Sequence, residues 1–148
     1  MAFLDVLDEL APSDRMRVLA HAERREFHDG ETVLEECVEN GSIFFILDGE
    51  VAVGRASPTM SDAEGFVELA RLGVGSVIGE MTFLTTNLTS AQVAAAGEVT
   101  VLSLSHRQLE DLMKSEPALA ARFYRSLAVT LAHRLTFANT AATQRLPS

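Results

Sequence analysis

The sequence is poor in cysteine, in basic residues and in long apolar runs, and each shortage excludes a class of protein. Its single cysteine, Cys37, rules out a disulfide within the chain. No apolar run approaches the roughly 18 residues that suggest a membrane span. The first five residues carry no basic side chain of the kind that opens a secretory signal. These absences predict a cytoplasmic protein with no membrane partner.

Basic residues are outnumbered, because 12 lysines and arginines stand against 21 aspartates and glutamates and the net charge is −9. Proteins that bind DNA usually carry a basic face, since neutralising phosphates supplies most of the non-specific affinity. The basic residues near the end of this chain are scattered, at Arg122, Arg125, His133 and Arg134. The sequence therefore predicts no nucleic-acid partner.

The chain does contain enough apolar material for one core, because 47% of its residues are hydrophobic and 22% are charged. That balance is ordinary for a globular protein. A length of 148 residues is the usual size of one domain and needs no disulfide or metal to fold. We expect a single domain over residues 1–148.

The order of the predicted elements is helix, strands, helix. An apolar face that begins at Pro12 predicts a helical segment within residues 1–22, ending near Ala22. Short apolar runs separated by turn residues fill residues 23–105. Many short strands with Gly-rich turns favour a β-sandwich or roll over alternating strands and helices. A helical pattern then returns over residues 106–139.

The start of that second helical region carries a clear signal. Ser105 followed three residues later by Gln108 is a capping-box pattern, which predicts a short helix to about Met113. Pro117 then begins a longer helix to about Asn139.

Turn signals divide the β-rich region. Asp48-Gly49 predicts a hairpin turn, and Gly97-Glu98 predicts a separation between the last two strands. The polar segment 57–65 is expected to be the tip of another hairpin.

Three segments occur together in a familiar order and spacing: residues 27–33, 43–51 and 75–91. They resemble the cyclic nucleotide-binding domain, the effector module of catabolite-activator-like regulators, protein kinase A regulatory subunits and cyclic-nucleotide-gated channels. The resemblance covers roughly residues 4–137. It implies an α+β, mainly β fold, a double-stranded β-helix or jelly-roll-like β-roll flanked by N-terminal helices and a long C-terminal helix. It also implies a regulatory module, not an enzyme, with cAMP or cGMP as its possible ligand.

The resemblance assigns a phosphate-binding cassette to residues 75–91, with these candidate ligand-binding residues: Gly79, Glu80, Met81, Thr89, Ser90 and Ala91. In the family a glycine turn lets backbone N–H groups approach the cyclic phosphate. A glutamate, here Glu80, accepts a hydrogen bond from the ribose 2′-hydroxyl. A small hydroxyl residue, here Ser90, assists at the phosphate.

The cassette departs from the family at Thr89, where an arginine normally neutralises the phosphate. No lysine or arginine lies between Arg71 and Arg107. Losing one charged hydrogen bond, worth about 1.5–3 kcal/mol, lowers affinity roughly ten- to a hundredfold. We therefore expect binding of cAMP or cGMP to be weak or lost.

Patterns for other chemistries are weaker. The spacing G-x-G-x-x-x-G over residues 73–79 is not the dinucleotide-binding fingerprint. The acidic turn around Cys37 repels a thiolate and so opposes reactivity of this cysteine. No two histidines are spaced four residues apart on a helix, and no G-x-S-x-G pattern occurs. We expect no metal site, no catalytic residues and no cofactor other than a possible cyclic nucleotide.

The last helix carries an apolar stripe with a repeat of four residues: Phe123, Leu127, Leu131 and Leu135. This stripe predicts a homodimer, and members of the resembled family often pair through this helix; the alternative is a helix absorbed by its own domain. The competing function is a ligand-free dimeric interaction scaffold. About ten residues follow Asn139, too few for a DNA-binding domain. The chain is then expected to act through an unknown protein partner or to be part of a longer protein.

Overall fold

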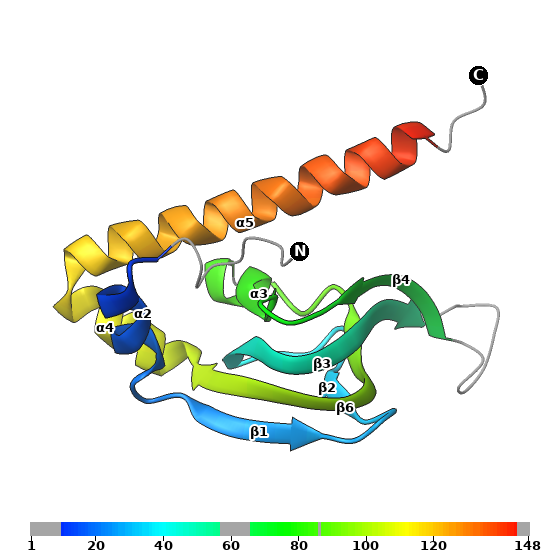
Figure 1. Cartoon of the computed structure of the whole chain (residues 1–148), viewed down its shortest axis with the longest axis horizontal. Coiled ribbons are helices and arrows are strands. Elements are labelled where there is room, and N and C mark those ends of the chain that lie inside the picture. The colour runs from blue at the N-terminus through cyan, green and yellow to red at the C-terminus, as the bar shows by residue number, and fades with distance from the viewer. Residues whose placement is uncertain (1–9, 57–65, 86, 145–148) are drawn as a thin grey trace.

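The computed structural model describes residues 10–56, 66–85 and 87–144, with only the helical backbone described for 137–144. Its elements are, in chain order, helix α2 (Pro12–Leu19), strands β1 (Glu23–Phe27), β2 (Thr32–Leu34), β3 (Ser42–Ala56), β4 (Phe66–Leu72) and β5 (Val77–Ile78), helix α3 (Glu80–Leu84), strand β6 (Gln92–Ser105), and helices α4 (His106–Ser115) and α5 (Pro117–Gln144). Helices α2 and α4 lie beside the first part of α5, at the end of the sheet where β6 leads into α4 (Figure 1). None of the described helices is long and apolar enough to cross a membrane.

The strands form one antiparallel sheet in the order β1-β6-β3-β4, with β2 also paired to β6 and β5 to β3. Strands β3 and β6 pair over most of their length, from Ser42 opposite Ser105 to Gly54 opposite Gln92. Helices α2, α4 and α5 flank this sheet (Figure 1). The expected class, a mainly β roll with a long C-terminal helix, is confirmed.

The turn predicted at Asp48-Gly49 is wrong, and so is the break at Gly97-Glu98, because β3 and β6 run through both points. The pairing of β3 with β6 shifts register on each side of Asp48. Gly49 and Gly97 have positive φ angles of 88° and 86°. A Cβ at Gly49 would lie 2.3 Å from the Glu98 carbonyl oxygen. Glycines of this kind mark bulges, which bend a strand without ending it.

The hairpin expected around residues 57–65 agrees with the observed pairing. Strands β3 and β4 are antiparallel, and Ala56 lies opposite Phe66. The loop itself lies outside the described residues, as do residues 1–9 of the predicted N-terminal helical segment.

The helices follow the sequence signals with small shifts at their ends. The capping box is confirmed, because the Ser105 hydroxyl accepts from the Gln108 N–H at 3.0 Å and the Gln108 side chain accepts from the Ser105 N–H at 3.0 Å. Helix α2 ends at Leu19, three residues before the expected end. Helix α5 begins at Pro117 as expected and extends to Gln144.

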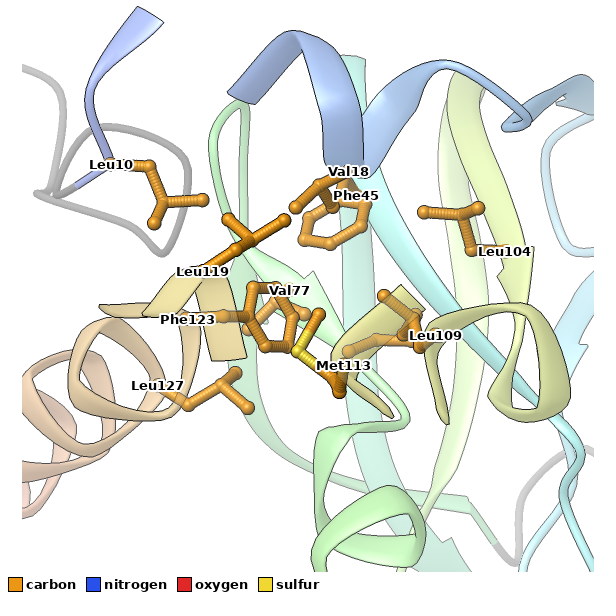
Figure 2. Packing of buried hydrophobic residues seen from close by; sticks show 11 residues of the cluster. Leu10, Val18, Phe45, Val77, Leu104, Leu109, Met113, Leu119, Phe123 and Leu127 are labelled. Atoms are coloured by element: carbon orange, nitrogen blue, oxygen red, sulfur yellow. The ribbon is translucent and has the colours of Figure 1, made fainter. Parts of the chain in front are cut away.

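Strand β3 is buried on both faces, which joins two cores. Phe44 and Ile46 face the inside of the roll, whereas Ile43 and Phe45 face the helices. This follows from the alternation of side chains along a strand. Figure 2 shows the helix-side cluster, where side chains of α2, α4 and α5 converge on those of β3, β5 and β6. The cluster fixes the start of α5 against the roll.

The position of α5 corrects part of the dimer prediction. Phe123 and Leu127 are 0% and 1% exposed and belong to their own domain's core, so they do not face a partner. Leu131 is half-buried, and Leu135 is 63% exposed. Only the latter half of the predicted stripe remains available for another chain.

Candidate functional site

All six residues of the predicted cassette line one cavity, which has a volume of about 130 Å³. Its other lining residues come from β2, β3, β4, β5, α3, β6 and α5: Leu34, Val53, Leu72, Val77, Ile78, Thr82, Val93 and Arg134. One side of the cavity is therefore apolar and belongs to the roll. The other side is polar and is built from the turn into α3, the 89–91 segment and α5.

Gly79 fixes the turn that opens the cassette. Its φ of 86° is left-handed, and a Cβ there would lie 2.5 Å from the Ser42 carbonyl oxygen. The Asn40 side-chain amide donates to the Ser42 carbonyl at 2.6 Å and to the Thr82 hydroxyl at 2.9 Å. The Thr82 hydroxyl in turn donates to the Gly79 carbonyl at 3.0 Å. These bonds tie the first turn of α3 to the start of β3 and so position the next residue, Glu80.

Glu80 is a buried carboxylate with one ionic partner among the described residues. It is 6% exposed, and Arg134 donates to its Oε1 from Nη1 at 3.0 Å. The other terminal nitrogen of Arg134 donates to the Val77 carbonyl at 2.8 Å. Burial raises the pKa of Glu80 above its ordinary value, and the nearby guanidinium opposes that shift. The pair joins β5, the start of α3 and the second half of α5.

Thr89, which stands where the family has arginine, lines the cavity but has its hydroxyl bonded to the 35–38 segment. Its hydroxyl donates to the Glu35 carbonyl and accepts from the Val38 N–H at 3.0 Å. Its backbone N–H and carbonyl also pair with this segment, at Val38 and Cys37. The side chain is 5% exposed. Thr89 therefore holds the 35–38 segment in place, with its one hydroxyl proton already donated.

Ser90 and Ala91 complete the predicted set at the cavity wall. Ser90 is exposed and Ala91 is half-buried.

No group of three or more histidine, cysteine or acidic side chains suited to a metal ion occurs within the described residues.

Sequence reasoning missed Arg134 as a cavity residue. It lies 54 positions from Glu80 and was visible only as one of several scattered basic residues. A signal was nevertheless present in the helix period. Leu127, Thr130 and Arg134 are spaced so that they share one face of α5, and the first two are buried. A charged residue that continues a buried stripe requires a partner, and Glu80 is that partner.

Comparisons with known proteins identify the family of this chain. A family model described as cyclic nucleotide-binding domain matches residues 24–116. The chain belongs to this family. Cyclic GMP-binding protein D of Dictyostelium discoideum is 36% identical to this cyclic nucleotide-binding domain over 90 residues, which are 60% of the chain and 7% of that protein. Glutaminase 2 of Bradyrhizobium diazoefficiens is 31% identical over 134 residues, which are 90% of the chain and 20% of that protein.

This cyclic nucleotide-binding domain thus spans a fifth or less of the length of those two relatives. Among solved structures, a cyclic nucleotide-binding domain from Methylobacillus flagellatus matches with a TM-score of 0.84 at 20% identity, over 98% of this chain and 83% of that one. That likeness supports the fold. The family resemblance expected from the cassette is confirmed.

Proposed function

We propose that this chain is a non-enzymatic regulatory module that binds a cyclic nucleotide, cAMP or cGMP, in the cavity lined by Gly79, Glu80 and Ser90. The observation that carries the proposal is the convergence of all six cassette residues on one cavity. Glu80 provides a buried acceptor suited to a ribose hydroxyl. The apolar wall from β2, β3 and β6 suits a base or sugar face. A family whose relatives include a cyclic GMP-binding protein makes this ligand class the first to test.

The cavity must widen to take such a ligand. Its volume of about 130 Å³ is below the roughly 300–1,000 Å³ of typical small-molecule sites. The roll side is built from paired strands, whereas the opposite side includes Arg134 on α5. We expect α5 to move when nucleotide enters, which is how binding would be transmitted to a protein partner in the cytoplasm.

We expect the cassette on its own to bind a cyclic nucleotide weakly. The Thr89 hydroxyl is engaged by the Glu35 carbonyl, and the segment carries no cation. Relative to a cassette that has the arginine, the loss is roughly ten- to a hundredfold in affinity.

Isothermal titration calorimetry with cAMP and cGMP tests the proposal. We expect saturable binding to the wild type and a roughly tenfold or greater loss in Glu80→Gln, because the amide presents a weaker acceptor to a ribose hydroxyl. Glu98→Gln is the matched control, since Glu98 is an exposed carboxylate paired with His28 outside the cavity. The absence of heat and of a thermal shift at millimolar nucleotide would refute nucleotide binding.

A second candidate, a ligand-free dimeric scaffold, is favoured by apolar side chains exposed near the cavity. Met81 and Leu84 on α3 are 51% and 41% exposed, and Leu135 on α5 is 63% exposed. Large exposed apolar side chains of this kind are candidates for an interface with another chain. Light scattering across concentrations, on wild type and Leu135→Glu, separates the readings. A dimer that dissociates in Leu135→Glu supports the scaffold, and a monomer at all concentrations counts against it.

A further inference from the structure

The charges that line the cavity come from two residues, Glu80 and Arg134. Their charges cancel, so a ligand anion meets a lining with no net charge. Glu80 repels a phosphate and Thr89 is uncharged. Arg134 is therefore the cavity's one source of positive charge among the described lining residues.

The Arg134 guanidinium has more N–H donors than its hydrogen bonds to described residues use. Arginine carries five N–H groups in a planar fork. Its hydrogen bonds to described residues use one N–H toward Glu80 and one toward the Val77 carbonyl. Three N–H groups therefore meet no described acceptor, and the side chain is 30% exposed. A guanidinium in this state can donate to a phosphate oxygen without releasing Glu80.

We propose that Arg134 pairs with the phosphate of the bound nucleotide and so takes the part of the arginine that Thr89 replaces. The inference rests on the function proposed above. Arg134 lies outside residues 24–116, so the family match gives it no role. Because Arg134 belongs to α5, the phosphate would hold this helix against the cavity. Ligand affinity and the position of α5 would then depend on one side chain.

The rival reading is structural, with Arg134 serving only to neutralise Glu80 and anchor α5 to Val77. The two readings differ in what they predict for a ligand that lacks the phosphate. A structural arginine affects the nucleotide and the nucleoside alike, because both need the same folded cavity. A phosphate-pairing arginine affects only the charged ligand.

The experiment is a calorimetric titration of cAMP and of adenosine, and in parallel of cGMP and of guanosine, into wild type, Arg134→Gln and Arg134→Lys. In wild type the cyclic nucleotide should bind more tightly than its nucleoside. Arg134→Gln should lower cyclic nucleotide affinity roughly ten- to a hundredfold and leave nucleoside affinity unchanged. Arg134→Lys keeps the positive charge and should therefore lose less cyclic nucleotide affinity than Arg134→Gln. Arg17→Gln is the matched control, since Arg17 also pairs with a carboxylate, that of Glu116, and neither residue lines the cavity.

Equal affinities of wild type and Arg134→Gln for the cyclic nucleotide overturn the inference and leave the proposed function standing. A parallel loss for nucleotide and nucleoside also overturns it and supports the structural reading. If no cyclic nucleotide binds to wild type, the proposed function fails as well. Should Arg134→Gln unfold because Glu80 is left unpaired, the double variant Glu80→Gln/Arg134→Gln compared with Glu80→Gln gives the same contrast with no buried carboxylate.

Discussion

Gly79 offers a direct test of how the cassette turn is built. Alanine at this position would meet two costs, a left-handed backbone and a steric clash of its Cβ, whereas alanine at Gly30 would meet only the first and alanine at Gly73 would meet neither. The Gly79 backbone is left-handed, with φ of 86°, and its missing Cβ would lie 2.5 Å from the Ser42 carbonyl oxygen. Gly30 has a φ of 83° but open space around its Cβ position. Gly73, at the other end of the same turn region, has open space and no positive φ. The three sites form a graded series.

The expected costs follow from these geometries. At Gly73, alanine is tolerated and is expected to be neutral or stabilising by up to about 1 kcal/mol, because it restricts the unfolded chain. At Gly30, the left-handed backbone alone costs about 1–2 kcal/mol. At Gly79, the contact with a carbonyl held in β3 adds about 1–3 kcal/mol of overpacking to that cost. Gly79→Ala should therefore lose about 2–5 kcal/mol, which is a fall in Tm of about 4–20 °C for a domain of this size.

Urea denaturation of the three alanine variants measures the series, with nucleotide titration as a second readout. Gly79→Ala should also weaken ligand binding, since it displaces Glu80, whereas Gly30→Ala should bind as wild type does. Equal stability of the Gly79 and Gly30 variants would show that the turn relaxes away from Ser42. Equal stability of all three would refute the left-handed backbone itself.

Three further predictions concern the core and the site. Phe123→Ala should destabilise the fold by about 3–5 kcal/mol in urea denaturation, because its ring is 0% exposed among helix and strand side chains; a loss below 1 kcal/mol would contradict its place in the core. Thr89→Val should cost about 1–3 kcal/mol, since it leaves the Glu35 carbonyl and the Val38 N–H without their side-chain partner; an unchanged midpoint would show that water replaces the hydroxyl. His106, whose ring packs 5.3 Å from that of Phe83, has its pKa lowered by burial. Its contribution to stability is present above the ordinary histidine pKa of about 6.5 and is lost as pH falls below it. His106→Gln should therefore lose less stability than wild type between about pH 6.5 and 5 in denaturation curves, and parallel pH profiles would contradict this.

Local signals in the sequence were enough for the elements whose causes are local. The capping box joins Ser105 to Gln108 within one helical turn, so residue type and spacing decide it. The cassette is also local, because Gly79 must adopt the left-handed turn that delivers the adjacent Glu80. The order of strands and helices predicted a mainly β fold, and the resemblance of residues 27–33, 43–51 and 75–91 to the cyclic nucleotide-binding domain predicted six of the cavity residues.

Tertiary contacts decided what the same signals left open. A left-handed glycine serves a hairpin turn and a bulge equally well, and only the pairing of β3 with β6 made Gly49 a bulge. Helix periodicity showed an apolar face on α5, but the domain's own core covers it at Phe123 and leaves Leu135 exposed. The partner of Glu80 is 54 residues away on a different element, a distance over which no sequence spacing predicts contact. Short-range backbone chemistry thus fixed the turn and its carboxylate, whereas the packing of α5 against the roll determined which cation reaches them.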